Sequence, residues 1–174
     1  DLGLTMSDGF KAAYEAAADG AAADAGRLLF AAGKAMANKV PSTMGSLMAT
    51  GLKQAGKDLK GKETLEDADL VQIFASYEAG VAKLGGAKVG DKTFLDGIHP
   101  AVESLKASLD AGESLSEMAG KAAQAAEEGF KATTTMLAVH GRAATRGEAS
   151  RELEDPGAYV AALIMKAFEK SVAE

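Results

Sequence analysis

At 174 residues the chain has the length of one domain, and its hydrophobic content of 47% is too high for a largely disordered chain. A formal net charge of -6 argues against a general nucleic-acid binder, and no apolar run approaches the roughly 20 residues that a membrane-spanning helix needs. Cysteine is absent, which excludes disulfides and thiolate metal sites and is compatible with a cytoplasmic location.

Helical spacing of apolar residues dominates the chain, and no alternating run is long enough to indicate a sheet. The first part of the sequence predicts helices over residues 4–18, 22–38 and 41–55. Gly20 and Gly56 fall at the expected breaks. Each break is short, so consecutive helices are expected to be antiparallel neighbours.

Capping residues indicate four further helix starts. They are Thr64 with Asp67, Asp91, Ser114 with Glu117, and Asp155 followed by Pro156. The helices that they open are predicted to run to residues 84, 109, 139 and 171, the first of them ended by Gly85 and Gly86. Pro100 is expected to kink or restart its helix, because proline lacks the N–H and clashes with the carbonyl four residues back. The fold is therefore predicted to be all-α, a bundle or barrel of about seven to eight antiparallel helices.

Several glycines fall inside the predicted helices, where each costs about 1 kcal/mol relative to alanine. They are Gly26, Gly33, Gly45, Gly80 and Gly120. Close approach of two backbones at a helix crossing would explain some of them.

Gly141-Arg142-Ala143-Ala144 combines a glycine with a fixed cation. The planar guanidinium of Arg142 can bridge phosphate oxygens. Alternatively, Arg142 is a cation at the end of the preceding helix, where it interacts favourably with the helix dipole. The motif by itself leaves both interpretations open.

Asp155-Pro156-Gly157 also allows two interpretations. It is either an ordinary helix start or a helix N-terminus whose free N–H groups face an anion or a ribose. Upstream, Gly90-Asp91-Lys92-Thr93 lacks the spacing of a P-loop and follows no strand, so we reject a Walker lysine. Thr93 remains a candidate to bond a phosphate or to fix the loop.

The opening residues Asp1 to Thr5 place an acid and a glycine just before a helix. This arrangement suits Mg²⁺ and phosphate together, because Mg²⁺ prefers carboxylates plus substrate phosphates. The two histidines, His99 and His140, have no partner histidine or cysteine nearby in the sequence and are interpreted as structural or exposed. A metal site built on histidine is not expected.

Together these segments resemble the L subunit, or L domain, of dihydroxyacetone kinases. That family has a Gly-Asp-Lys-Thr-Met loop followed by an aspartate, which residues 90–94 and Asp96 resemble. It also has Gly-Arg-Ala-Ser, Gly-Glu and Asp-Pro-Gly-Ala in this order, to which residues 141–144, 147–148 and 155–158 correspond. The resemblance covers residues 1–174 as a single nucleotide-binding domain. It implies a barrel of helices that holds ADP or ATP and Mg²⁺ at one end.

The resemblance implies a role for each matched position. Asp1 is expected to bind Mg²⁺, and Arg142 is expected to contact the nucleotide and to be the catalytic residue that stabilises charge during phosphoryl transfer. Gly85 and Phe94 are expected to flank the adenine. The other nucleotide-binding candidates are Leu2, Gly3, Leu4, Thr5, Ser42, Thr43, Met44, Thr93, Asp155, Pro156 and Gly157.

The chain also departs from the family pattern. Leu2 stands where the family usually has histidine and Thr5 where it has asparagine, and residues 41–46 replace the usual Gly-Gly-Ala-Ser-Gly-Pro. The family's first helix and its other two metal-binding aspartates would precede Asp1, so the chain as written is expected to lack them. These departures predict a divergent member that acts on another small keto-sugar.

In that family the sugar is bound covalently through a histidine on a separate K subunit. The resemblance therefore implies a K-type partner docked over the nucleotide end. A phosphotransferase-system phosphoryl donor protein and a homodimer are further candidate partners, whereas nucleic acid and membranes are not expected. The alternative function is a helical regulatory or interaction module that has the same fold but no kinase activity.

Overall fold

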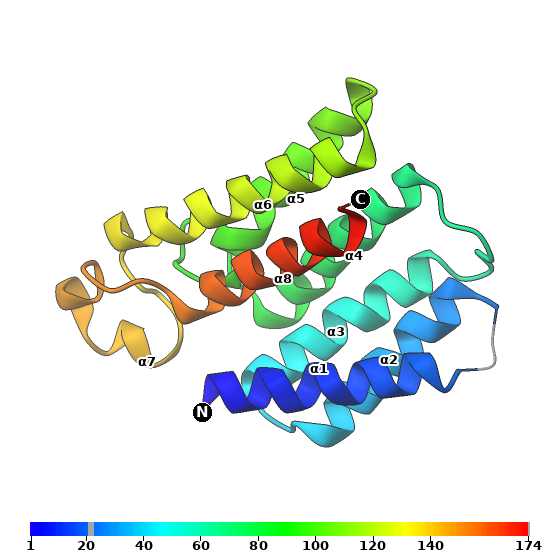
Figure 1. The fold of residues 1–174 in the computed structure, drawn as a ribbon. Helices are drawn as coiled ribbons and strands as arrows, with labels where there is room; N and C mark the ends of the chain where they lie inside the picture. Colours follow the sequence, from blue (N-terminus) through cyan, green and yellow to red (C-terminus); the bar gives the residue numbers. More distant parts are fainter. Residues whose placement is uncertain (21–22, 174) are drawn as a thin grey trace. The chain divides into compact units, whose positions relative to one another are not determined.

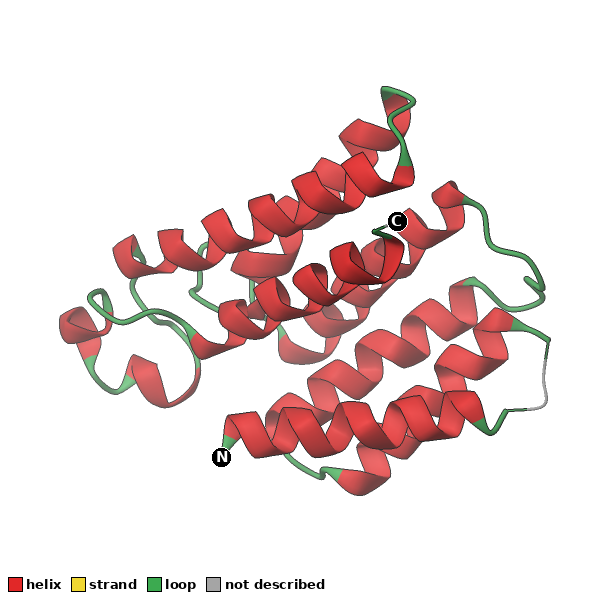
Figure 2. Cartoon of the chain, viewed as in Figure 1, coloured by secondary structure: helices red, strands yellow, loops and turns green. Residues whose placement is uncertain are grey.

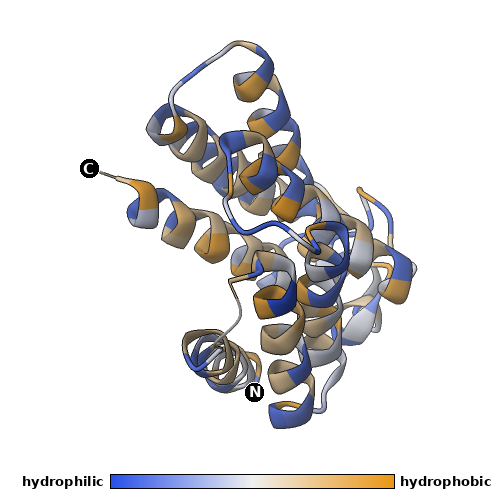
Figure 3. Ribbon diagram, turned by 90° about the vertical axis from the view of Figure 1, so that its right-hand side faces the viewer, coloured by the Kyte–Doolittle hydropathy of each residue, from blue (hydrophilic) through white to orange (hydrophobic). Residues whose placement is uncertain are grey.

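The computed structural model describes residues 1–20 and 23–173. Over these residues it contains eight α-helices, two short 3-10 helices and no strand, which confirms the all-α prediction (Figures 1 and 2). Figure 3 shows hydrophilic and hydrophobic residues interspersed along the helices, as amphipathic helices require. None of the described helices is both long and apolar enough to cross a membrane. The chain divides into two compact units, residues 1–86 and the residues from 87 onward.

The first unit contains four helices. They are α1 (Leu2–Ala18), α2 (Ala25–Lys39), α3 (Thr43–Asp58) and α4 (Asp67–Gly85). Helix α2 packs against α1 and α3, and α3 packs against α4. Successive helices run in opposite directions (Figure 1). Methionines fill much of the core, including Met36 and Met48, because their flexible side chains fit irregular gaps.

Glycines allow α2 and α3 to cross closely. A Cβ added at Gly26 would lie 2.6 Å from the carbonyl oxygen of Gly56 and 2.5 Å from the backbone nitrogen of Lys60. Gly26 therefore does mark a tight crossing. The predicted helix break at Gly56 is wrong, since α3 continues to Asp58 and Gly56 serves helix packing instead of a turn.

Side-chain caps determine where α2 and α3 begin. Asp24 accepts from the Arg27 N–H at 3.2 Å, and Ser42 accepts from the Gly45 N–H at 3.0 Å. The predicted start of the second helix at residue 22 lies outside the described residues. The predicted start of the third helix at Pro41 moves to Thr43, because Ser42 supplies the cap.

Glu66 and Asp69 form the capping box of α4, two residues beyond the predicted pair Thr64 and Asp67. The backbone N–H of Glu66 donates to the Asp69 carboxylate at 2.9 Å, and the Lys62 ammonium pairs with the same carboxylate at 3.2 Å. The bond from Glu66, followed by the contact with Lys62, lowers the pKa of the Asp69 carboxyl below its ordinary value of 3.8. The predicted pair was wrong because Asp67 and Asp69 both lie near the helix start, and each could complete a capping box with the residue three positions before it.

Acid is expected to weaken this end of α4. Because folding lowers the pKa of Asp69, the native state binds fewer protons than the unfolded state near pH 3.8, so the stabilisation is complete above that pH and is lost as the pH falls through the native-state pKa. We expect Asp69→Asn to lower the urea midpoint at about pH 6, and the difference from wild type to shrink toward about pH 3. Urea titrations followed by circular dichroism measure this. A pH-independent difference would contradict the assignment to the carboxylate charge.

The second unit is built on three long helices. They are α5 (Phe94–Asp110), α6 (Leu115–Ala132) and α8 (Pro156–Val172), each packed against the other two. The connection from α6 to α8 contains η1 (Thr133–Thr135), α7 (Gly141–Ala144) and η2 (Gly147–Ser150). In Figure 1, α5 and α8 run in the same direction and α6 in the opposite one. The first turns of α5 and α8 therefore lie at the end of the unit where α6 finishes.

Two of the three predicted starts in this unit are confirmed. Ser114 forms the capping box of α6, and Asp155 caps α8 ahead of Pro156. The prediction that Asp91 caps α5 is wrong. Thr93 is the N-cap, and its backbone N–H donates to the Asp96 carboxylate at 2.7 Å.

Helix α5 continues through Pro100 and does not restart there. Helix α6 ends at Ala132, not at the predicted residue 139. The hydroxyls of Thr133, Thr134 and Thr135 each donate to the carbonyl three residues earlier, at 2.6, 2.9 and 2.8 Å. Such local bonds compete with the α-helical pattern, and the following Met136 is extended.

Candidate functional site

The candidate site is organised by the loop that precedes α5. Gly90 and Lys92 have positive φ angles of 101° and 63°. A left-handed conformation is unfavourable for a lysine, so contacts of the folded protein must hold it there. Only 2% of the Lys92 surface is exposed, whereas Asp91 beside it is half-buried.

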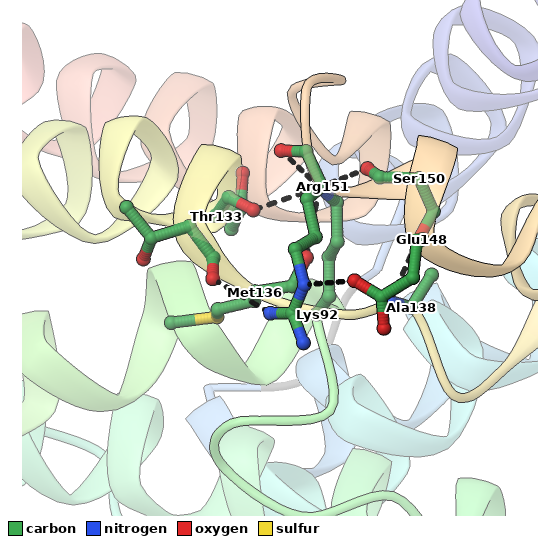
Figure 4. A network of polar contacts seen from close by, with 8 residues as sticks. Lys92, Thr133, Met136, Ala138, Glu148, Ser150 and Arg151 are labelled. Atoms are coloured by element: carbon green, nitrogen blue, oxygen red, sulfur yellow. Dashed lines mark hydrogen bonds and ion pairs between the residues drawn. The ribbon is translucent and has the colours of Figure 1, made fainter.

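The Lys92 ammonium donates to backbone carbonyls from both ends of residues 133–151, called here the anchored segment. The donor–acceptor distances are 2.7 Å to Thr133 and 2.6 Å to Ser150, with longer contacts of 3.4 Å to Met136 and to Arg151 (Figure 4). Burial lowers the pKa of Lys92, and the negative charge of Asp155 opposes this shift. The ammonium is occupied by protein acceptors, which agrees with the rejection of a Walker lysine.

Asp91 contacts the anchored segment from its exposed side. The carboxylate accepts from the Lys88 N–H at 2.9 Å and lies 3.0 Å from His140 Nε2, and the carbonyl accepts from the Val139 N–H at 3.3 Å. The bond from Lys88, followed by the contact with His140, lowers the pKa of the Asp91 carboxyl. His140 thus has a structural contact, in line with its interpretation from the sequence.

Arg142 lies in α7, between the two ends that Lys92 holds. Gly141 begins this short helix with a φ of 68°, and the Arg142 side chain is exposed. Within the described part of the chain, no protein group hydrogen-bonds to its guanidinium. Because α6 ends ten residues earlier, Arg142 is not the cation at the end of that helix, and the dipole interpretation does not fit. The guanidinium is available to an anion.

Asp155 is buried at the start of α8. Its carboxylate accepts from the Ala158 N–H at 2.7 Å, and its own N–H donates to the Thr133 hydroxyl at 3.0 Å. Burial raises the pKa of the Asp155 carboxyl, and the nearby negative charge of Asp96 adds to this. Asp155 therefore connects the start of α8 to the beginning of the anchored segment.

Helices α5 and α8 begin side by side. A Cβ added at Gly157 would lie 3.0 Å from the backbone nitrogen of Phe94 and 2.9 Å from the Asp155 carboxylate. The second unit thus brings together Thr93, Phe94, Asp155, Pro156 and Gly157, which the family resemblance suggested as nucleotide contacts. Phe94 is buried, with 3% of its surface exposed. Its contact with adenine stays a prediction.

The remaining candidates belong to the first unit and lie at helix ends. Asp1 caps α1 by accepting from the Leu4 N–H at 3.3 Å, and Ser42 caps α3. The others lie in the first turn of α1, in the first turn of α3 and at the last residue of α4: Leu2, Gly3 and Thr5; Thr43 and Met44; and Gly85. Their contacts with a nucleotide stay predictions.

Protein groups alone offer few ligands for a metal ion. Over the residues that the structure describes, no cluster of three His, Cys, Asp or Glu side chains could hold one. Asp1 is a single exposed carboxylate, and one of its oxygens caps α1. Because Mg²⁺ commonly takes one or two carboxylates plus substrate phosphates and waters, Asp1 fits as one ligand to a Mg²⁺ that arrives with phosphates.

Sequence reasoning missed Lys92 as the residue that organises the anchored segment. The apolar neighbours Phe94 and Leu95 hint at burial, but the acceptors of the ammonium are backbone carbonyls, which leave no mark in a sequence. A lysine in a Gly-rich loop is also typical of an exposed phosphate ligand. Its structural role could be recognised only from the fold.

The DAK2 domain family matches residues 1–170, and the chain belongs to this family. The match spans both compact units. The resemblance noted in the sequence is thereby confirmed.

Among its relatives is the Escherichia coli (strain K12) PEP-dependent dihydroxyacetone kinase, ADP-binding subunit DhaL, which is 33% identical over 95% of this chain and 79% of its own length. L-erythrulose 1-kinase of Mycolicibacterium smegmatis and human triokinase/FMN cyclase are each 34% identical over 96% of the chain. The chain spans only 29% of the length of these two proteins. The crystal structure of the dihydroxyacetone kinase of C. freundii is similar with a TM-score of 0.62 and 25% identity, over 85% of this chain and 24% of that one.

Proposed function

We propose that this chain is the nucleotide-binding part of a dihydroxyacetone-type kinase. It binds ADP or ATP with Mg²⁺, and the phosphoryl group passes to dihydroxyacetone or a related small keto-sugar held on a K-type partner. Support comes from membership of the DAK2 family and from the E. coli relative, which is described as an ADP-binding subunit. The relatives named as erythrulose kinase and triokinase support a short ketose as the acceptor.

The observation that carries the proposal is the exposed Arg142 guanidinium on a segment anchored at both ends. Lys92, which anchors the segment, directly precedes the N-cap of α5, and α8 begins beside α5. A phosphate at this end of the second unit meets a free guanidinium and the positive dipole ends of two long helices, whose first N–H groups are largely occupied by the caps Thr93 and Asp155. Phosphoryl transfer needs such positioning and charge neutralisation more than covalent chemistry.

The proposed roles belong to each unit separately. In the second unit, Arg142 stabilises charge on the phosphoryl group, Phe94 flanks the adenine, and Thr93 with residues 155–157 borders the nucleotide. In the first unit, taken by itself, the N–H groups of residues 2, 3, 43 and 44 remain as helix N-terminal donors, because those of Leu4 and Thr5 bond to Asp1 and that of Ser42 bonds to Val40. Asp1 supplies a carboxylate to Mg²⁺. The bound Mg²⁺ would neutralise phosphate charge.

Arg142→Ala is expected to weaken ADP binding about 10- to 100-fold, because charge-assisted hydrogen bonds to a phosphate are lost. Isothermal titration of full-length protein with ADP and Mg²⁺ measures this. Arg146→Ala is the matched control, since Arg146 is also exposed and belongs to the same anchored segment. Equal losses in both variants would indicate a general charge effect, and failure of the wild type to bind any adenine nucleotide would overturn the proposal.

The alternative is a helical regulatory or interaction module without kinase activity, favoured by the divergent residues 41–46 and by Leu2. Mixing the full-length protein with a K-type partner and a small ketose separates the two functions, since any phosphorylated ketose excludes the alternative.

The rate at which bound nucleotide dissociates distinguishes the two possible sources of the phosphoryl group. A subunit recharged by a phosphotransferase-system donor protein retains its ADP, whereas an ATP-dependent one releases it quickly. We also propose a cytoplasmic location and treat a homodimer as a candidate assembly.

A further inference from the structure

The Lys92 ammonium joins two stretches of backbone that are far apart in sequence. Thr133 and Met136 belong to the beginning of the anchored segment, and Ser150 and Arg151 belong to its end. One buried cation therefore closes the base of a long surface loop (Figure 4). Closing a flexible loop of this length removes many alternative conformations, so the bonds to Lys92 restrict where the middle of the segment can lie.

Few other contacts hold the middle of the segment. The Ala138 N–H donates to the Ser150 hydroxyl at 3.0 Å, and His140 contacts Asp91 at the exposed side. Arg151 donates to the Thr135 carbonyl at 3.1 Å, which again joins the two ends. The Arg142 side chain has no hydrogen bond within the described residues, so its position depends on the contacts of Val139 and His140 with Asp91 and on the ends that Lys92 ties together.

We propose that Lys92 is a positioning residue, which holds the anchored segment so that Arg142 is presented to the nucleotide. The proposal rests on the proposed nucleotide site, because Arg142 has its role there. Lys92 itself does not touch the ligand: its side chain is 2% exposed and its ammonium donates to backbone carbonyls. Lysine is suited to this task, since a compact ammonium can donate to several carbonyls that converge from different directions.

The first test examines the loop without any ligand. Lys92→Met keeps the length of the aliphatic chain but removes the donors, and Lys106→Met on the exposed face of α5 is the matched control. Hydrogen exchange read by mass spectrometry should speed up about tenfold or more across residues 136–150 in Lys92→Met, with α1 to α4 unchanged. Unchanged exchange in this segment, or an equal increase in the control, would overturn the proposal.

The second test is a double-mutant cycle on ADP affinity. We expect Lys92→Met to weaken binding about tenfold, and the double variant with Arg142→Ala to bind no more than about twofold worse than Arg142→Ala alone. Fully additive losses would mean that Lys92 acts independently of Arg142, which contradicts positioning. If the wild type bound no nucleotide, the proposed function would fail, while the exchange experiment would still decide whether Lys92 holds the segment.

A measurement on the wild type covers the case in which Lys92→Met does not fold. Acetylation by a water-soluble active ester, followed by mass spectrometry, should modify Lys92 at least about 100-fold more slowly than the exposed neighbour Lys88, and saturating ADP should leave the Lys92 rate unchanged. A Lys92 that reacts as fast as Lys88, or that only ADP protects, would be a phosphate ligand and would overturn the proposal.

Discussion

Gly129→Ala is expected to destabilise the protein by about 2 kcal/mol or more, although alanine is the better helix former. Pro100 cannot donate to the carbonyl of Asp96 four residues earlier, and its ring lies against the same turn. A Cβ on Gly129 would collide with this carbonyl oxygen and lie 2.9 Å from Pro100 Cγ. Backbone and a proline ring cannot move aside cheaply, so α6 would be pushed away from α5.

Gly120 provides a control in the same helix. A Cβ there would meet only the Glu169 carboxylate, at an ordinary 3.6 Å, so Gly120→Ala should stabilise the protein by about 0.5–1 kcal/mol. The sequence suggested Gly120 as a possible tight crossing, and the structure shows that it is not one. Urea unfolding of both variants gives the two free energies. Equal effects of the two substitutions would contradict the described packing of α6 on α5.

Thr133→Val is expected to destabilise the protein by about 1–3 kcal/mol. The Thr133 side chain is fully buried, and its hydroxyl donates to the Phe130 carbonyl while it accepts from the Asp155 N–H. Valine has nearly the same shape but no hydroxyl, so the buried N–H at the start of α8 would lose its partner.

Thr134→Val and Thr135→Val are matched controls, because both hydroxyls make the same local bond to a carbonyl three residues earlier but are exposed. Water can replace those bonds, so each control should change the free energy of unfolding by less than about 0.5 kcal/mol. Thermal and urea unfolding of the three variants provide the comparison. A Thr133 variant as stable as the other two would show that the bond to Asp155 contributes little.

Much of the fold could be predicted from local patterns. Apolar residues at helical spacing indicated an all-α chain, and two capping motifs, at Ser114 and at Asp155, were placed correctly. Local bonds between residues three apart have sequence signatures, since both partners lie in the same short stretch. The same rules chose the wrong residue where two candidates for one capping position lie close together. This happened with Asp67 and Asp69 at the start of α4, and with Asp91 and Thr93 at the start of α5.

The sequence by itself determined the helical class and the membership of the DAK2 family, and the resemblance to that family predicted nucleotide contacts for residues at the starts of α5 and α8. Only the tertiary structure decided the role of Lys92 and which glycine of α6, Gly129 and not Gly120, is crowded. The physical reason is common to both. The Lys92 ammonium and a Cβ on Gly129 meet backbone carbonyls of distant segments, and backbone is chemically the same at every residue, so these partners are identified only once the chain has folded.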